Sequence, residues 1–395
     1  MPMAAASTTV ILGAGFGGIV CANALRKALP ADHKVVLIEK GATFNFGAAK
    51  TWVAIGEKTA SDIVTPLESL KRRGIDLVTA EVKSIDPKAR AVETTSGRFK
   101  GDYMVIALGA DTNMAAIPGL ADVAHSFYTL DGASRLREAL PKFTGGKLVL
   151  LIPRAPFKCP PGPYEGAFLL HDLFKRKEMR DRVELYVVTV EGRPMATAGP
   201  EIGDFVMQEL RARNIAYLTQ KKTVSVSPAE KKIHFEDGSS VDFDFLIAVD
   251  PHVAPKVVTD SGLAQPGGWI PVDAKTLAVA GFDNLWAIGD VATVPLPGRF
   301  KPDAPLVLPK AGVMADAEAR VVAKQIAARV QGTTSDAAFD GKGFCFIETG
   351  DMHAVKGEGS FFELPHPIMQ RRVPDMMQYE EKKKWMYDWL RENLV

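Results

Sequence analysis

The chain has 395 residues, and its 48 lysine and arginine residues balance 47 aspartate and glutamate residues to a net charge of +1. This length predicts two domains and a small third part, and the balanced charge gives no indication of a nucleic-acid partner. Three cysteines are too few for a disulfide scaffold. No apolar stretch reaches the roughly 18 residues of a membrane-spanning helix, and residues 1–9 lack a signal-peptide pattern. We therefore expect a cytoplasmic protein, with contact to a membrane surface left open.

A βαβ unit opens the sequence. Residues 9–12 predict a buried strand, residues 19–29 a helix and residues 35–39 a second buried strand. The first strand runs into Gly-Ala-Gly-Phe-Gly-Gly at 13–18, which matches the GxGxxG pattern. Strand, glycine turn and helix in this order predict a site for a dinucleotide, either FAD or NAD.

Each glycine of this pattern has a physical role, and so does the acidic residue that follows it. Gly13 permits the tight turn, Gly15 lets the backbone approach a pyrophosphate, and Gly18 permits close helix–strand packing. The helix N-terminus then presents free N–H groups to the phosphates. Glu39 ends the second strand beside Lys40, at the distance where an acid binds the ribose hydroxyls.

Two later segments favour FAD. Residues 102–110 and residues 284–292 each predict a buried strand that ends at a glycine. The second resembles the Gly-Asp motif of two-dinucleotide-domain flavoproteins, whose aspartate holds the flavin ribityl chain. A helix then begins near residue 312, and in that family its N-terminus faces the flavin pyrimidine edge, where its dipole stabilises negative charge. The cofactor residues that we assign to these segments are Ala107, Gly109, Gly289, Asp290, Lys310 and Gly312.

The predicted fold class is α/β, with two Rossmann-like FAD/NAD(P)-binding-type domains and a small C-terminal segment. We expect a split FAD domain at 1–112 and 250–330, and a second domain at 113–249 whose nucleotide site is degenerate. Residues 331–395 form the C-terminal segment. The second domain has its own pattern of a strand at 147–153, a helix at 164–179 and a strand at 183–189.

The turn after residue 153 is where relatives that use NAD(P)H have a second glycine-rich phosphate loop. Here residues 154–165 contain four prolines, which have no N–H to give a phosphate, and side chains where glycines are needed. Pyridine nucleotide binding at this turn is therefore not expected. Cys159 lies in the turn just before a helix, so the helix N-terminus and Lys158 are predicted to lower its pKa and make it a nucleophile. The alternative is a small buried packing residue.

The other two cysteines have different surroundings. Cys345 lies in the segment 343–350 and is either a partner for Cys159 or a cysteine in the core of a strand. Cys21 lies on the helix after GxGxxG, among small residues, and is predicted to serve packing only.

Residues 8–350 resemble sulfide:quinone oxidoreductase and the flavoprotein subunit of flavocytochrome c sulfide dehydrogenase. The matching motifs are Thr51-Trp52-Val53-Ala54-Ile55-Gly56, Cys159-x-x-Gly162-Pro163-x-Glu165, Pro309-Lys310-x-Gly312, and Cys345-Phe346 followed by Gly350. We expect Trp52 of the first motif, like Lys40, to be a cofactor-binding residue. The resemblance implies that sulfide or a persulfide attacks a Cys159–Cys345 disulfide or sulfur-bridged form, that electrons pass through FAD to a quinone, and that zero-valent sulfur leaves as polysulfide or to an acceptor. Glu165 is either the base of this reaction or a solvated carboxylate at a helix N-terminus.

The sequence also departs from these families. Many of the quinone reductases carry a third cysteine in a Cys-Thr-x-Asp-His-like stretch, but residues 128–132 read Tyr-Thr-Leu-Asp-Gly here, which puts long polysulfide growth in doubt. Flavocytochrome c attaches FAD through a cysteine near its second strand. No cysteine lies between Glu39 and Trp52, so we expect the FAD to be non-covalent.

Residues 379–394 predict one amphipathic helix. Trp385, Met386, Trp389 and Leu390 share its apolar face, while Lys382 falls among them and is expected to extend its head outward to solvent. The helix is either an interfacial membrane anchor or packed on the protein body or on a second copy of the chain. Phe361-Phe362 either line a quinone pocket or lie in a buried strand.

The leading hypothesis is oxidation of sulfide or persulfide with quinone as the electron acceptor. The alternatives are a type II NADH dehydrogenase, a flavin subunit that passes electrons to a cytochrome, and a flavoprotein that only binds partners. No metal-ligand set is expected, and a homo-oligomer is left open.

Overall fold

The computed structural model describes residues 7–395 and has the predicted α/β class. A five-stranded parallel sheet forms its first layer, in the order β20-β9-β1-β2-β5. The bounds are β1 (Thr8–Leu12), β2 (Lys34–Glu39), β5 (Asp76–Thr79), β9 (Tyr103–Ile106) and β20 (Leu285–Ala287). The strand at 285–287 therefore pairs with one that lies far earlier in the chain. The inner strands β1 and β9 are almost wholly buried, as expected for a parallel sheet that is covered on both faces.

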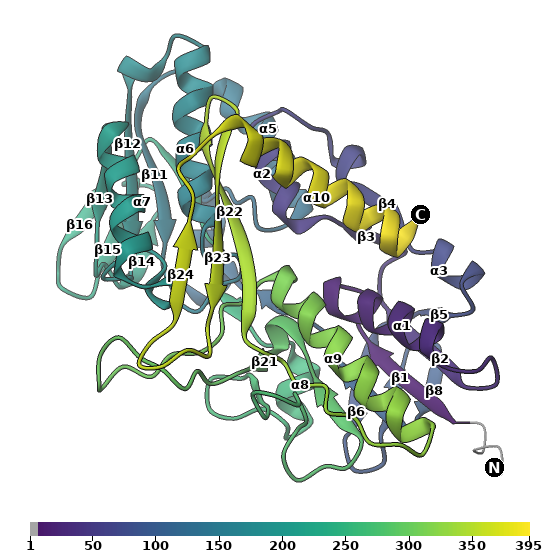
Figure 1. Ribbon diagram of the computed structural model, residues 1–395. Coiled ribbons are helices and arrows are strands. Elements are labelled where there is room, and N and C mark those ends of the chain that lie inside the picture. Colours follow the sequence, from purple (N-terminus) through teal and green to yellow (C-terminus); the bar gives the residue numbers. More distant parts are fainter. Residues whose placement is uncertain (1–6) are drawn as a thin grey trace.

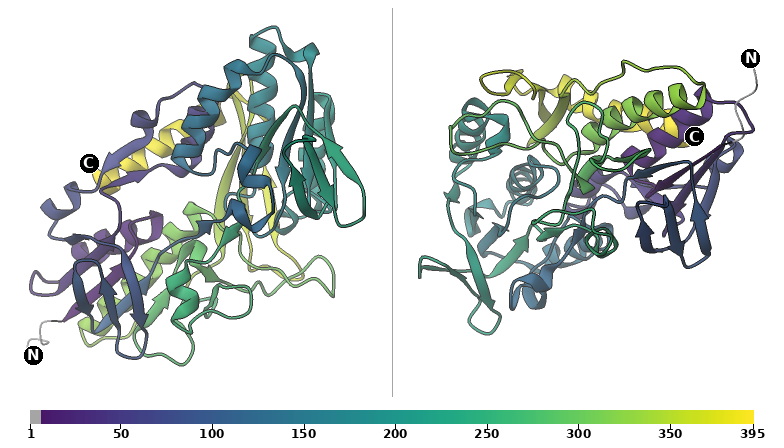
Figure 2. Two further views of the ribbon diagram at one scale, coloured as in Figure 1. Left: turned by 180° about the vertical axis from the view of Figure 1, so that it is seen from behind. Right: turned by 90° about the horizontal axis from the view of Figure 1, so that it is seen from below.

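Helices α1 (Phe16–Ala28) and α9 (Gly312–Val330) pack side by side against this sheet (Figures 1 and 2). Small residues allow the close approach. A Cβ on Gly312 of α9 would lie 2.7 Å from the ring of Phe16, and one on Gly17 of α1 would lie 3.3 Å from the carbonyl oxygen of Ala315 on α9. The glycines of the first turn thus set the spacing between the two helices as well as the turn itself.

A second parallel sheet, in the order β13-β12-β11-β17, occupies the other lobe of the molecule (Figure 1). Its strands are β11 (Gly146–Ile152), β12 (Val183–Thr189), β13 (Ile215–Leu218) and β17 (Phe245–Ala248). Helix α6 (Gly162–Arg176) connects β11 to β12, and its apolar residues are buried. Two small antiparallel sheets flank the lobes, formed by β6 (Val82–Asp86), β7 (Ala91–Thr94) and β8 (Gly97–Lys100), and by β14 (Thr223–Ser227), β15 (Lys232–Phe235) and β16 (Ser240–Asp242).

The C-terminal segment is more than a helix. An antiparallel sheet of β22 (Lys342–Gly350), β23 (His353–Ser360) and β24 (Ile368–Arg371) precedes helix α10 (Met376–Leu394). β22 packs on α6, and α10 lies over β23 and reaches α1 (Figure 1). The segment therefore connects the two lobes.

The remaining elements are short connections. The helices are α2 (Lys50–Ala54), α3 (Ser69–Arg72), α4 (Leu120–Val123), α5 (Leu130–Ala139), α7 (Pro200–Ala212) and α8 (Lys256–Asp260). The strands are β3 (Thr43–Asn45), β4 (Val64–Pro66), β10 (Asp111–Thr112), β18 (His252–Val253), β19 (Ile270–Pro271) and β21 (Ala292–Thr293). None of the helices within residues 7–395 combines the length and the apolar character needed to cross a bilayer.

Gly18 offers a test of this packing. An ideal Cβ at Gly18 would lie 1.8 Å from the carbonyl oxygen of Gly13, so Gly18→Ala must move the turn away from the helix. We expect a loss of roughly 1–3 kcal/mol in the free energy of unfolding, measured by chemical denaturation. Gly192→Ala is the control, because Gly192 is exposed and its Cβ would meet only a side-chain atom at 3.9 Å. Equal stability of the two variants would contradict the steric account.

Candidate functional site

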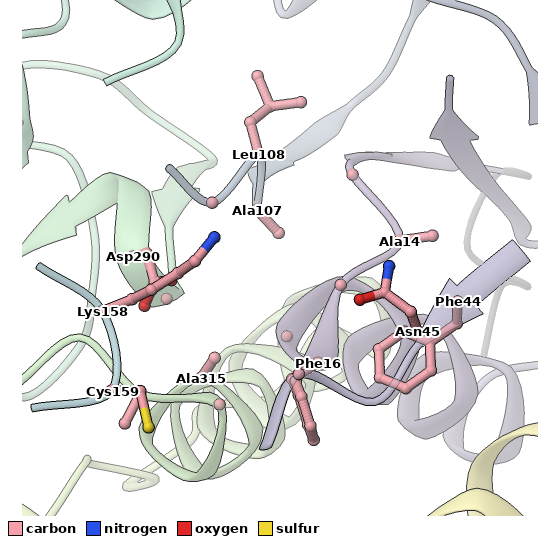
Figure 3. A pocket seen from close by; sticks show the side chains of 18 of the residues that line it. Ala14, Phe16, Phe44, Asn45, Ala107, Leu108, Lys158, Cys159, Asp290 and Ala315 are labelled. Atoms are coloured by element: carbon pink, nitrogen blue, oxygen red, sulfur yellow. The ribbon is translucent and has the colours of Figure 1, made fainter. Parts of the chain in front are cut away.

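A cavity of about 650 Å³ lies where the two lobes and the C-terminal segment meet. The predicted site residues that line it are Gly13, Gly15, Glu39, Lys40, Ala107, Gly109, Cys159, Glu165, Gly289, Asp290, Gly312 and Cys345. Figure 3 shows Lys158, Cys159 and Asp290 on one side of the cavity and Ala14 and Asn45 on the other. Residues expected to bind a dinucleotide and residues expected to do sulfur chemistry thus share one space.

Three predicted residues do not line the cavity. Gly18 supports the turn from behind, as described above. Trp52, on α2, is buried and donates from Nε1 to Glu348. Lys310 donates to the backbone carbonyls of Asp290 and Ala292, and its ammonium group lies 3.7 Å from the ring centre of Trp269. These residues position the lining rather than form it.

Three helix N-termini point at the cavity. The first turns of α1, α6 and α9 all contribute lining residues, among them Phe16, Gly162 and Gly312. None of the three helices has a side-chain hydrogen bond at its N-cap. The positive ends of three helix dipoles therefore favour anionic groups in this cavity.

The glycine-turn end of the cavity fits a dinucleotide. A Cβ on Gly15 or Gly109 would meet no atom within 4 Å, so the backbone there is open to close approach by a ligand. Glu39 accepts hydrogen bonds from the backbone N–H of Ala14 at 2.7 Å and of Gly41 at 3.1 Å. Its carboxylate is thereby fixed at the end of β2, where ribose hydroxyls would reach it.

Cys159 occupies a strained position at the far end of the cavity. Its φ of 55° lies in the left-handed region, which is uncommon for a residue with a side chain. Two backbone hydrogen bonds of 2.8 Å hold it there: its N–H donates to Lys310, and its carbonyl accepts from Gly162. Such conformations persist only where the surroundings enforce them, and they concentrate at functional sites.

The predicted low pKa of Cys159 is wrong. Burial raises the pKa of its thiol to about 11 and Glu165 adds to the rise, while Lys382 and the N–H of Gly162 act in the opposite direction. Burial likewise raises the pKa of Cys345 to about 12, with further contributions from Cys159 and Glu165. The helix N-terminus is too weak an influence to offset removal from water, so both thiols are protonated at neutral pH.

The structure places all three cysteines clearly. Cys345 lies in β22, and it is half-buried with a place in the cavity lining, together with Cys159 and Glu165. Cys21 is completely buried in α1 and lies outside the lining, as its packing role requires. All three are free cysteines.

Lys382 is the largest departure from expectation. Its predicted extension into solvent is wrong, because its side chain is 3% exposed and its Nζ lies between two buried carboxylates. The Nζ is 2.9 Å and 3.0 Å from the oxygens of Glu165 and 2.5 Å from Oε1 of Glu348. The alternative of a solvated Glu165 is wrong for the same reason. An ammonium group buried among apolar residues is retained here by two opposite charges.

Further hydrogen bonds complete this cluster. Thr51 donates to Oε1 of Glu165 at 3.1 Å, and the N–H of Glu348 donates to Oε2 of Glu165 at 3.2 Å. Trp52 donates to the same Glu348 oxygen that Lys382 contacts, at 2.7 Å. Burial raises the pKa of Glu165. Burial alone would lower the pKa of Lys382, but the two carboxylates outweigh it and raise that pKa.

Helix α10 packs on the protein body with its tryptophans inward. Trp389 is buried, stacks on Phe44 with ring centres 4.9 Å apart, and donates from Nε1 to Asp316. Trp385 lines the cavity. The anchor hypothesis, in which these tryptophans lie at the depth of lipid headgroups, is therefore wrong, and the alternative of packing on the body is correct. Phe361 is buried beside β23 and does not line the cavity.

Several residues in and around the site were not predicted from the sequence. Glu348 follows Cys345 by three residues in β22 but reads as an ordinary strand residue. Glu318 lies on α9, is buried, and accepts the backbone N–H of Gly289 at 2.6 Å. Lys50 donates to the carbonyl of Tyr128, and burial lowers its pKa to about 7. Only Glu318 could have been noticed in the sequence, because it is an acidic residue among the alanines of α9.

The contribution of Lys382 to stability can be tested by comparison with Lys384, an exposed lysine on the same helix. Lys382→Met leaves two buried carboxylates without a cation, so we expect a loss of roughly 3–5 kcal/mol in the free energy of unfolding. Lys384→Met is the control on the same helix, because that lysine is 73% exposed and pairs only with Asp388. The free energy of unfolding of Lys384→Met should stay within roughly 0.5 kcal/mol of that of the unchanged protein. Denaturant titration of both variants decides the point, and equal losses would contradict the buried cluster.

Glu318 gives a prediction about pH. Burial raises its pKa from 4.5 to about 8, so between these pH values the folded chain holds a proton that the unfolded chain releases. Stability from this group is therefore lost as the pH rises across that window. Glu318→Gln keeps an acceptor for Gly289 and carries no proton to lose. We expect the thermal midpoint of Glu318→Gln to rise relative to that of the unchanged protein between pH 5 and pH 8. A difference in midpoint that does not change with pH would contradict the raised pKa of Glu318.

Comparison with known proteins agrees with this arrangement. The family model described as pyridine nucleotide-disulphide oxidoreductase matches residues 7–151 and 165–317, which is most of the chain. The chain belongs to this family. It is therefore a flavoprotein oxidoreductase, and the two-domain α/β class predicted from the sequence is confirmed. The residues that the family model leaves unmatched between its two parts include the proline-rich turn with Cys159.

Similar proteins fall into two groups. A sulfide-quinone reductase of Aquifex aeolicus is 27% identical over 388 residues, which are 93% of this chain and 86% of that protein. The mitochondrial sulfide:quinone oxidoreductase of Mus musculus is 24% identical, over 72% of this chain and 66% of that protein, so the match spans just under two thirds of the mouse chain. A type II NADH:quinone oxidoreductase of Staphylococcus aureus is 26% identical over 90% of both chains.

A solved structure shows the same fold. The sulfide:quinone oxidoreductase of Aquifex aeolicus superposes with a TM-score of 0.87 over 98% of this chain and 91% of that one, at 24% identity. The arrangement of both lobes and of the C-terminal segment is therefore shared.

Proposed function

We propose that the protein oxidises sulfide or a persulfide to zero-valent sulfur with FAD as cofactor and passes the electrons to a quinone. One observation carries this proposal: Cys159, Cys345 and Glu165 line the cavity whose other end holds the glycine turn. The names of the similar proteins from Aquifex and mouse point the same way.

The described residues fit FAD. We propose that 1–112 and 250–330 bind it, that Gly13 and Gly15 face its pyrophosphate, that Glu39 holds a ribose, and that the α9 N-terminus faces the flavin ring. No cysteine lies between Glu39 and Trp52, so the cofactor is held without a covalent bond at that position. When bound, the flavin accepts two electrons from the sulfur centres and passes them on.

The cysteine pair accounts for the sulfur chemistry. Hydrosulfide attacks the sulfur of Cys159 in a Cys159–Cys345 disulfide; a new S–S bond forms and the old one breaks. Cys345 leaves and takes up the proton of the hydrosulfide, so the negative charge rests on the outer sulfur of the Cys159 persulfide. A thiol or a second sulfide then takes the outer sulfur from the persulfide and leaves Cys159 as a thiolate. The two cysteines would return to the disulfide by giving two electrons to the bound flavin, so one zero-valent sulfur would be made for each quinone reduced.

We place the persulfide on Cys159 for an electrostatic reason. Lys382 and the N–H of Gly162 both favour negative charge at Cys159, whereas the neighbours that act on Cys345 disfavour it. Burial raises the pKa of Glu165, which makes it a better proton acceptor near neutral pH. We therefore propose Glu165 as the base that takes the proton of the incoming sulfide.

A second cavity of about 730 Å³ suits a quinone. Phe16, Phe344, Phe346 and Trp385 line both this cavity and the first one. An aromatic wall shared by two cavities offers apolar contact to a flat ring on its outer side. Helix α10 supplies much of the remaining lining.

A type II NADH:quinone oxidoreductase is the second candidate, because the Staphylococcus aureus protein is about as similar. The turn before α6 disfavours it. Pro160 and Pro161 have no N–H for a phosphate, and Pro161 is the N-cap residue of the helix.

One anaerobic titration tests the proposal. Sulfide added to the purified flavoprotein should bleach the visible flavin band, and NADH should bleach it at least about a hundredfold more slowly. Cys159→Ser and Cys345→Ser should each lower the rate with sulfide by roughly a thousandfold or more, since removal of a nucleophile abolishes its covalent step.

Cys21→Ser is the matched control and should bleach at the normal rate, because Cys21 lies outside the cavity. Rapid bleaching by NADH alone would establish the second candidate instead. No bleaching by either donor would exclude both functions.

A further inference from the structure

Tyr128 lies beside Cys159 in the cavity. It begins the stretch 128–132, where the resemblance to sulfide:quinone oxidoreductases leads us to expect a third cysteine. Its side chain is 5% exposed and belongs to the lining together with Cys159 and Gly162. The position that a Cβ on Gly162 would occupy lies 3.1 Å from the Tyr128 Oη and 3.3 Å from the Cys159 Sγ. Because Gly162 has no side chain, the hydroxyl and the thiol border the same small space.

The hydroxyl has no hydrogen-bond partner among residues 7–395. A buried polar group left without a partner costs roughly 1–3 kcal/mol, so such a group in a cavity wall indicates a bound partner that the chain itself does not supply. The space it borders is the space beside Cys159 Sγ.

The rest of Tyr128 is firmly held. Its N–H donates to Ser126 Oγ at 3.0 Å, and its carbonyl accepts from Lys50 at 2.9 Å. Phe127 stacks on its ring and His252 packs edge-on, each with ring centres 5.3 Å apart. The phenol is thus fixed in place before anything binds.

The hydroxyl is a donor at neutral pH. Burial raises its pKa well above 10, and the acidic groups nearby, Cys159 first and then Asp250, Glu191 and Glu165, raise it further. A protonated phenol without a hydrogen-bond partner among residues 7–395 favours an anionic ligand, and Lys382 and the N–H of Gly162 favour negative charge at the neighbouring Cys159.

We propose that the Tyr128 hydroxyl donates a hydrogen bond to the sulfur anion at Cys159, first to the entering hydrosulfide and then to the outer sulfur of the persulfide. Tyr128 is thus a substrate-positioning residue for a small sulfur anion. This inference rests on the proposed function. A phenol holds the anion without bonding covalently to sulfur, so sulfur accumulates on Cys159 alone.

Tyr128→Phe removes only the hydroxyl and tests the proposal in the flavin-loaded enzyme. A hydrogen bond to a charged group corresponds to roughly a tenfold or larger effect on affinity. We expect the sulfide concentration for half-maximal flavin bleaching to rise about tenfold or more, while the limiting rate changes less than about threefold. Alkylation and mass spectrometry of sulfide-treated enzyme should show less persulfide on Cys159 at subsaturating sulfide.

Tyr217→Phe is the control, because it removes a buried phenol hydroxyl that is not part of the cavity lining. It should leave the half-maximal concentration unchanged. Three results would overturn the proposal: an unchanged half-maximal concentration in Tyr128→Phe, an equal rise in both variants, or a change confined to flavin content or thermal midpoint. If sulfide fails to bleach the unchanged enzyme, the proposed function itself fails, so the two failures are distinguishable.

Discussion

The ammonium group of Lys382, buried between Glu165 and Glu348, is the interaction on which the architecture of the site depends. It joins α10, α6 and β22, three elements from distant parts of the chain. Two carboxylates this close repel each other, and burial makes the repulsion stronger. The lysine removes that repulsion only if α10 lies in its observed place, so the position of the C-terminal helix and the charge state of the site are coupled.

The same helix completes the aromatic side of the molecule. Once Lys382 is fixed, Trp385 and Trp389 are brought against Phe16 and Phe44, and Trp385 becomes part of the wall between two cavities. Phe16 is the first residue of the helix that follows the glycine turn. Residues near both ends of the chain therefore form the aromatic wall together. The glycine turn is not sufficient to form the site without helix α10.

Burial raises the pKa values of the two thiols, whereas the positive end of a helix dipole lowers the pKa of a nearby thiol. Removal from water raises both pKa values, and the surrounding carboxylate adds to the rise. Lys382 and the N–H of Gly162 favour negative charge at Cys159 and not at Cys345. The phenol of Tyr128, which has no hydrogen-bond partner among residues 7–395, borders the same space as the Cys159 thiol. This asymmetry makes the two cysteines different in kind although both line the same cavity.

The sequence by itself determined the parts that depend on neighbours along the chain. The strand, glycine turn and helix at residues 9–29, six of the nine strands of the two parallel sheets, and the loss of the second glycine loop follow from local backbone requirements. The strands β5, β13 and β17 were not predicted. The tertiary structure alone decided the rest. The contacts of Lys382 with Glu165 and Glu348 span 217 and 34 residues, and an amphipathic pattern does not specify whether lipid or protein covers the apolar face. The direction of a thiol pKa shift depends on desolvation, a property of the folded surroundings that no local motif encodes.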